Sequence, residues 1–211
     1  MRAEELLTQC DHALIAFDGP IAELPAIDAG RLRTMVADSR PPRKVRHADD
    51  PFVVVAFAAT IGPGTEQAVY TQLRRLELEA VASASVAPGA REALATMAAA
   101  GTQVTVVSGL ALRAVRTFLV IHGLLAHVKH LACRTGPDPA VLPPAPDLIT
   151  SVIHEHAMES CVFVGSTDDD LTAARAAGVR AFRHRYRPAA EPAESQEPAE
   201  PPTWFDALRD R

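Results

Sequence analysis

HALIAFDGPI, residues 12–21, is the stretch that decides the fold of this chain. An apolar run that closes on Asp-Gly-Pro predicts a buried strand followed by a tight turn. Because strand side chains alternate, residues 16 and 18 point to the same side of the sheet. Two carboxylates at such positions could share the roles of nucleophile and general acid or base at a phosphate. Only Asp18 is an acid here, and Ala16 stands at the other position.

Apolar strands alternate with helical patterns over most of the chain outside residues 22–88. This alternation predicts an α/β fold with a doubly wound parallel sheet, in which ligands bind at the carboxyl ends of the strands. Residues 1–21 and 89–187 are expected to form this core. The expected strands lie near 12–17, 103–108, 127–133, 161–165 and 179–184, and the expected helices near 89–100, 110–123, 147–158 and 168–177.

Three further stretches have distinctive residues at or after the ends of predicted strands. QVTVVSG, residues 103–109, ends in Ser-Gly just before a helical pattern, whose first N–H groups could bind an anion. RTGPDPAVLPPAPDL, residues 134–148, is rich in proline. CVFVGSTDDD, residues 161–170, leads from an apolar strand through Gly-Ser-Thr to three acids.

Together with residues 12–21, these stretches resemble the four signatures of haloacid dehalogenase-like hydrolases, in the same order along the chain. The resemblance implies a Rossmann-like core with a small helical cap inserted after the first strand, and Mg2+ as the cofactor of an active member. It also implies a phosphate site in which the Ser108 hydroxyl and the Gly109 N–H hold the phosphoryl group. Gly19, Ser166 and Thr167 would lie beside it.

Three positions depart from the family pattern. The resemblance puts Ala16 where these enzymes carry the phosphate-accepting aspartate, and Pro143 where they carry a lysine that neutralises the phosphate. Ser166 takes the place of the first magnesium-binding acid. Asp18 and Asp170 are kept, and Asp170 is the candidate metal ligand if a metal binds at all.

These three losses fall in one reaction centre, and they predict a catalytically inactive pseudophosphatase. Proline offers neither charge nor a donor, and Mg2+ depends on carboxylate oxygens. We therefore expect a module that binds a protein partner or an anionic small molecule, with no cofactor. The alternative is a weak or atypical phosphomonoesterase, dependent on Mg2+, that uses Asp18 directly. Lys129 is a candidate substitute for the missing lysine.

The same residues also have purely structural interpretations. Asp18 could be retained because Asp-Gly-Pro suits a turn, and Ser108 could cap the helix that follows it. The acids at 168–170 could form a solvated helix start, because negative charge favours helix N-termini. The histidines show no spacing typical of a metal site.

Residues 22–88 are predicted to form the inserted helical cap. Asp50-Pro51 would begin a helix over residues 52–58, although that apolar run could also be a strand. Residues 65–81 show the three- and four-residue apolar spacing of a helix. The stretch 40–47 is predicted to be a basic loop that either is solvated or contacts an anion or a partner.

The composition changes after residue 187. Residues 188–201 are rich in Pro, Glu and Ala and are predicted to be a linker. Residues 202–211 contain Trp204, Phe205 and Leu208, which would share one face of a short helical turn. This segment could dock onto a partner, which gives a third possible function, or fold back onto its own chain.

Charge and cysteine content limit the classes of partner and compartment. The chain has 211 residues and a net charge of −5, which argues against nucleic-acid binding. Its three dispersed cysteines fit a reducing cytoplasm. We expect no membrane span and no leader sequence. The oligomeric state is left open.

Overall fold

The computed structural model describes residues 10–156 and 160–184. The predicted linker at 188–201 and the predicted docking segment, with Trp204, Phe205 and Leu208, lie outside the described residues and stay predictions.

A five-stranded parallel sheet forms the centre of the molecule, with the strand order β5-β4-β1-β6-β7. β1 is the middle strand, so the stretch that follows it lies between the ends of β4 and β6. Its register pairs His12 with both Gln103 and Cys161. The strands are β1 (His12–Ala16), β4 (Gln103–Ala111), β5 (His130–Arg134), β6 (Cys161–Gly165) and β7 (Arg180–Arg183).

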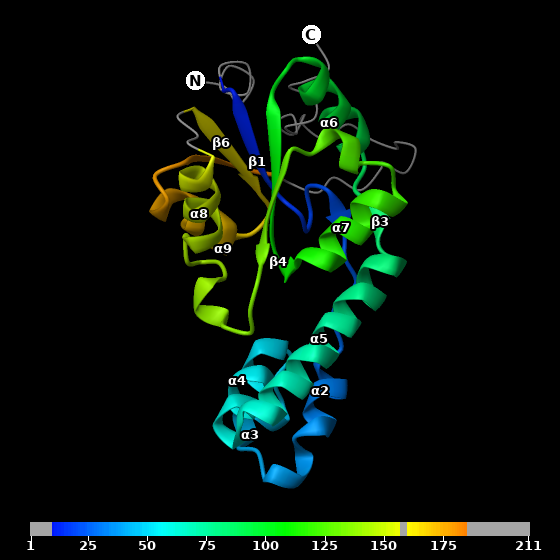
Figure 1. Cartoon of the computed structure of the whole chain (residues 1–211), viewed down its shortest axis with the longest axis vertical. Coiled ribbons are helices and arrows are strands. Elements are labelled where there is room, and N and C mark those ends of the chain that lie inside the picture. Colours follow the sequence, from blue (N-terminus) through cyan, green and yellow to red (C-terminus); the bar gives the residue numbers. More distant parts are fainter. Residues whose placement is uncertain (1–9, 157–159, 185–211) are drawn as a thin grey trace, which may run out of the picture.

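Helices cover both faces of this sheet, as Figure 1 shows. Ile15 and Phe17 pack on one face with α6 and α7, while Leu14 and Ala16 pack on the other with α8 and α9. The alternation of strand side chains therefore divides the core into two apolar layers. The α/β doubly wound fold predicted from the sequence is confirmed. The helices are α6 (Ala90–Ala99), α7 (Leu112–Ile121), α8 (Asp147–Glu155) and α9 (Asp168–Ala176).

The insertion after β1 contains four helices that pack around their own apolar cluster, which includes Leu32, Val54 and Leu73. Figure 1 shows them beyond one end of the sheet, with the longest helix running back toward the core. A two-stranded antiparallel ribbon of β2 (Ala22–Glu23) and β3 (Ser85–Val86) lies where the chain leaves and returns. The helices are α2 (Ala29–Met35), α3 (Arg43–Arg46), α4 (Pro51–Ile61) and α5 (Pro63–Ser83). The division into core and cap stays a prediction.

Local sequence explains how α4 begins. The Asp50 side chain accepts a hydrogen bond from the Phe52 N–H at 2.8 Å, and Pro51 is the first helical residue. The helical interpretation of residues 52–58 is therefore confirmed, and the strand alternative is wrong. The basic stretch 40–47 is not a loop throughout, because residues 43–46 form the short helix α3 around the buried Val45.

In the part of the chain that the structure describes, no helix combines the length and apolar character needed to cross a membrane.

Candidate functional site

The carboxyl ends of β1, β4 and β6 surround a small pocket of about 130 Å3. Ala16, Pro143 and Ser166, the three positions that depart from the family pattern, all line this one pocket. Asp18, Ser108, Gly109, Thr167 and Asp170 line it as well, together with an apolar wall of Phe17, Val107, Ala145, Leu148, Ile149, Phe163 and Ala173.

Gly19 shapes the turn beside the pocket. Its φ of +90° belongs to the region that favours glycine, and its N–H donates to the Ala22 carbonyl at 2.9 Å. A Cβ atom at this position would lie 2.7 Å from the Ser166 Cβ. The turn and β6 therefore approach each other more closely than any other residue would allow.

Asp18 is exposed at the mouth of the pocket. Partial desolvation raises the pKa of its carboxyl, and the charge of Asp170 raises it further, while hydrogen bonds with the backbone of Leu24 and Gly19 oppose the shift. The pocket thus presents two neighbouring carboxyl groups, and among the described residues that line it none is Lys, Arg or His.

The stretch after β6 is used to begin helix α9. The Asp170 Oδ2 accepts hydrogen bonds from the N–H groups of Ser166 and Thr167, both at 3.0 Å, and the Thr167 hydroxyl accepts one from the Asp170 N–H. This is a capping box, which satisfies N–H groups that the helix leaves without partners. The observed hydrogen bonds therefore agree with the interpretation of this stretch as the start of a helix.

The Ser166 hydroxyl donates a hydrogen bond to the Asp18 backbone carbonyl at 3.0 Å. In the family pattern this carbonyl and the acid at position 166 would both face the magnesium ion. Here the neutral Ser166 hydroxyl is hydrogen-bonded to that carbonyl, and the Asp170 carboxylate accepts hydrogen bonds from two backbone N–H groups. Among the described residues, no group of three or more His, Cys, Asp or Glu side chains could hold a metal. Without an acid at position 166, this site offers Mg2+ fewer anionic oxygen ligands than the family pattern does.

Ser108 has a different role from the predicted helix cap. β4 continues to Ala111, and α7 begins at Leu112 without a side-chain cap. The Ser108 hydroxyl accepts a hydrogen bond from the Leu110 N–H at 3.1 Å, so it braces an irregular stretch at the end of β4. The helix-cap interpretation of Ser108 is therefore wrong.

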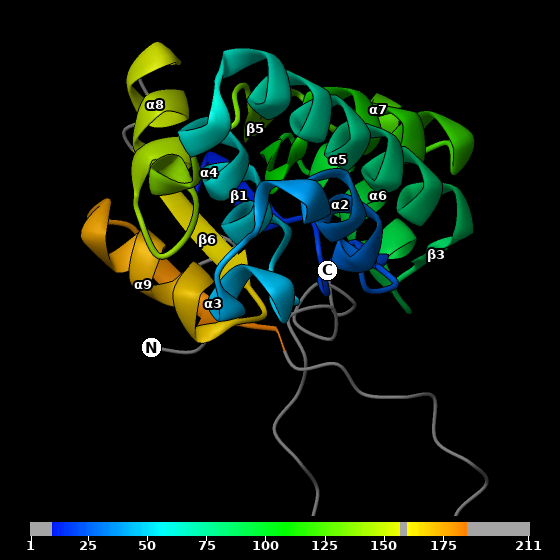
Figure 2. The same ribbon diagram turned by 90° about the horizontal axis from the view of Figure 1, so that it is seen from below.

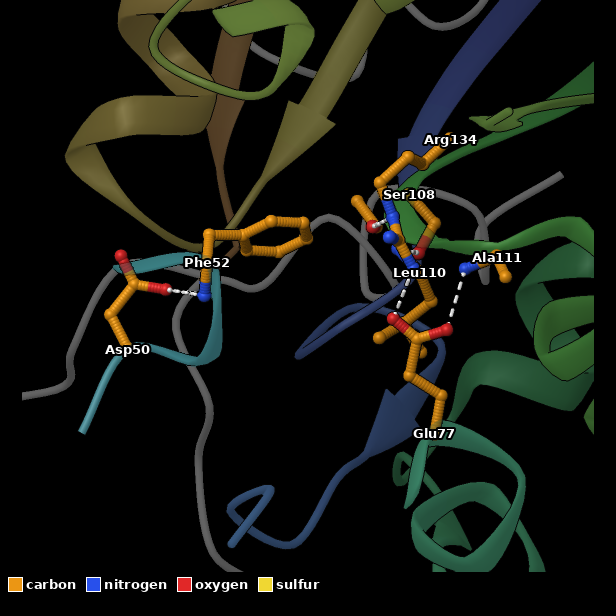
Figure 3. A network of polar contacts seen from close by, with 8 residues as sticks. Asp50, Phe52, Glu77, Ser108, Leu110, Ala111 and Arg134 are labelled. Carbon is orange, nitrogen blue, oxygen red and sulfur yellow. Dashed lines mark hydrogen bonds and ion pairs between the residues drawn. The ribbon is translucent and has the colours of Figure 1, made fainter. Parts of the chain in front are cut away.

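A buried ion pair joins the insertion to the core beside this stretch, and the sequence did not predict it. Glu77 of α5 pairs with Arg134 at the end of β5, and their side chains are 1% and 0% exposed. The second Glu77 oxygen accepts the Ala111 N–H at 3.1 Å, and the Arg134 Nε donates to the Gly109 carbonyl at 2.9 Å. Figure 3 shows the Glu77 carboxylate between Ala111 and Arg134.

Two aromatic rings of the insertion complete this junction. The Arg134 guanidinium carbon lies 4.9 Å from the ring centroid of Phe52 and 4.9 Å from that of Tyr70. Burial raises the pKa of Glu77, and the positive charge of Arg134 opposes that shift. One sequence signal was available, because Glu77 follows Leu73 and Leu76 within the apolar stripe of the predicted helix.

Lys129 cannot replace the missing lysine. It directly precedes β5, and its N–H donates to the carbonyl of Val104, the second residue of β4, at 2.8 Å. Because the strands are parallel, this is the amino-terminal edge of the sheet, opposite the pocket. The prediction that Lys129 could act there is wrong.

Comparisons with known proteins agree with this fold. The family model for haloacid dehalogenase-like hydrolases matches residues 45–178, and the chain belongs to that family. Among solved structures, CbbY from Rhodobacter sphaeroides in complex with phosphate has a TM-score of 0.63 at 17% identity, over 87% of this chain and 90% of that one. A predicted phosphoglycolate phosphatase from Haemophilus somnus 129pt has a TM-score of 0.61 at 16% identity, over 84% and 86%.

At these identities the two structures show a shared fold only. Curated protein sequences contain no significant match to the chain.

Proposed function

We propose that this chain is a pseudophosphatase, a binding module that keeps the phosphatase frame without its chemistry. The observation that carries the proposal is the clustering of Ala16, Pro143 and Ser166 around one pocket. An alignment shift could produce one such loss, but three losses that meet in space remove the reaction centre itself.

Each loss removes a different part of phosphoryl transfer. Alanine at position 16 has no oxygen that could attack phosphorus, so no covalent aspartyl-phosphate can form there. Proline at 143 and serine at 166 leave the charge of the transferred group without its cation and without an anionic metal ligand. Because residues of one catalytic unit act together, losing them all costs about as much rate as losing the most important one.

Charge also favours one class of partner over another. Asp18 and Asp170 both line the pocket, and within the described parts of the chain no cationic side chain lines it. A phosphate or carboxylate ligand would therefore meet like charge, which weakens binding. We propose a protein partner that covers the mouth of the pocket, in preference to an anionic small molecule, and no resident metal ion.

The first test is hydrolysis of p-nitrophenyl phosphate by the full-length chain with Mg2+ at several millimolar. We expect the rate to equal that of buffer, and the Asp18→Asn variant to behave identically. Turnover that needs Mg2+ and disappears in Asp18→Asn would overturn the proposal and show that the Asp18 carboxyl is required for catalysis. Calorimetric titration with inorganic phosphate is the companion measurement, and we expect no saturable heat.

A further inference from the structure

The insertion carries a concentrated positive surface on a chain whose net charge is −5. Arg40, Arg43, Lys44 and Arg46 lie within seven residues, and all four are exposed. We call these four residues the basic face. Within the described parts of the chain, none of them forms an ion pair. Val45, buried between them, attaches the segment to the rest of the insertion.

A groove of about 820 Å3 adjoins the basic face between α2 and α3. Among the residues that the structure describes, Arg33, Arg40 and Arg46 line this groove, and no acid does. Arg33 donates to the Ala48 carbonyl and lies 3.9 Å from an oxygen of the exposed Asp49. The other nearby acids are Asp28, which caps α2, Asp38, which is exposed, and Asp50, which caps α4. Repulsion among the four clustered cations is therefore only partly offset, and an anionic partner would relieve it.

The chain itself contains a segment of complementary charge. Residues 188–202, here the Glu-rich segment, hold four glutamates and no Lys, Arg or His. The glutamates recur at every third position, at 191, 194, 197 and 200, among five prolines. A proline-rich stretch favours the polyproline II helix, which has three residues per turn. In that conformation all four carboxylates would lie along one side, about 9 Å apart.

The described chain ends at the edge of the sheet that faces the insertion (Figure 1). His184 follows β7, and its N–H donates to the Gly165 carbonyl at 2.7 Å, so the chain leaves the carboxyl edge of the sheet, which faces the insertion. Figures 1 and 2 both place α3 on the α9 side of the molecule, away from α7. Residue 200 is sixteen positions beyond residue 184, which allows a span of up to about 53 Å.

We propose that the Glu-rich segment docks onto the basic face of the same molecule. The attraction is electrostatic, between one row of carboxylates and four exposed cations, so it weakens as salt screens it. The segment would then lie across the insertion and carry the Trp204 region that follows with it. This interaction does not depend on whether the pocket hydrolyses phosphate.

Carbodiimide cross-linking tests the proposal directly, because it joins only a carboxylate and an amine in contact. The chain has two lysines, Lys44 on the basic face and Lys129 on the far edge of the sheet, and none follows residue 184. We expect the full-length chain at low salt to give an amide between Lys44 and one of the four glutamates, identified by mass spectrometry. Lys129 should give no link to these glutamates.

The controls separate contact within one molecule from other arrangements. In a mixture of 15N-labelled and unlabelled chains, the linked peptides should be wholly labelled or wholly unlabelled. Mixed pairs would overturn the proposal in favour of a second copy as the occupant. Sodium chloride at about 0.5 M should reduce the yield at least fivefold, because screening at that salt confines charge interactions to a few ångströms.

Variants provide the matched comparison. Lys44→Arg keeps the charge and should abolish the link, which confirms the linked amine. Arg43→Glu with Arg46→Glu keeps Lys44 but reverses the field, and should lower the Lys44 yield at least fivefold with an unchanged circular dichroism spectrum. If Lys44 reacts normally with an acetylating reagent and yet never links to residues 191–200, the proposal is wrong.

Discussion

Two neighbouring regions at the carboxyl edge of the sheet differ in which charged residues they contain. At the pocket, Ala16, Pro143 and Ser166 replace charged residues of the family pattern, and a neutral hydroxyl donates to the Asp18 carbonyl. At the junction, Glu77 and Arg134 form an ion pair at almost zero exposure. The chain thus retains a buried ion pair where the insertion meets the core, and it lacks three charged residues of the family pattern at the pocket.

Burying an ion pair such as Glu77 and Arg134 has a large free-energy cost. Taking two charges out of water costs several kcal/mol each, and an ion pair recovers that cost only with good geometry and additional hydrogen bonds. Arg134 and Glu77 have such bonds to Gly109 and Ala111, and Arg134 also contacts two rings. Such a pair specifies one arrangement of the two parts, which a binding module needs even when it performs no chemistry.

The largest effect is expected when the three charged residues of the family pattern are restored to the pocket. The triple variant Ala16→Asp, Pro143→Lys, Ser166→Asp should hydrolyse p-nitrophenyl phosphate with Mg2+ at least about 100-fold faster than the unmodified chain, since nucleophile, cation and metal ligand are all regained. Initial rates with and without EDTA measure this. Adding Asp18→Asn to the triple variant should remove the gain.

The single variant Ala16→Asp is the matched control, because it regains the nucleophile without the lysine or the metal ligand. We expect its rate to stay at the level of buffer. If the folded triple variant binds Mg2+ and still does not turn over, the three positions alone do not separate this pocket from a working phosphatase site.

Breaking the junction should have the next largest effect. Glu77→Ala leaves the Arg134 charge buried without its partner and should lower the free energy of unfolding by about 3–5 kcal/mol. Urea denaturation at neutral pH measures the loss. Replacing both residues with methionine should recover most of it, because removing both charges also removes their desolvation cost.

Glu79→Ala on the same helix is the control for this prediction. Glu79 pairs with Arg31 at the surface, where their side chains are 57% and 47% exposed, and such pairs contribute about 0–1 kcal/mol. If Glu77→Ala costs no more than Glu79→Ala, the junction is not the strong contact that its burial indicates.

The sequence predicts the pocket much better than the junction. Apolar runs such as 161–165 form the observed strand β6, because a buried parallel strand needs continuous apolar residues. Ala16, Ser108 and Ser166 follow or end such strands, and parallel strands present their carboxyl ends at one edge. That rule alone brings the three residues together. Pro143 lies on a connecting segment, and only the family resemblance placed it there.

The junction depends on information that local patterns do not contain. Glu77 and Arg134 are 57 positions apart, and their pairing follows from how α5 lies across the end of β5. No periodicity determines that crossing, because it results from packing between elements that are far apart in the sequence. The end of β4 was missed for a similar reason, since Glu77 accepts the Ala111 N–H from outside the local sequence.

The residues that begin α9 also line the pocket, and a substitution there can test whether they act as a helix cap. Thr167→Ala removes one half of the capping box and should lower the free energy of unfolding by about 0.5–2 kcal/mol. Thermal unfolding, followed by circular dichroism, measures the change. Thr172→Ala, an exposed position within the same helix, should cost less than about 0.5 kcal/mol. Equal losses in the two variants would show that the cap is not important.

The smallest expected effect concerns Asp18. Partial desolvation first, and then the charge of Asp170, raise the pKa of its carboxyl in the folded protein. The folded chain therefore binds this proton more tightly than the unfolded chain, so the contribution of Asp18 to stability is full at low pH and is lost as pH rises through the folded pKa. Asp18→Asn should be more stable than the unmodified chain at pH 7, and this advantage should vanish near pH 4.

Because Asp18 is exposed, solvent screening limits this difference to no more than about 0.5 kcal/mol, which urea denaturation of both chains in EDTA can measure. Asp38→Asn, at an exposed position on the insertion, serves as the control. Repeating the pH 7 measurement with Mg2+ tests the pocket, because an ion held by Asp18 would stabilise only the unmodified chain, by mass action. If Mg2+ makes the unmodified chain more stable than Asp18→Asn, the pocket holds a metal ion and the proposal is contradicted. If Asp18→Asn remains the more stable chain, the two carboxylates have no ion between them.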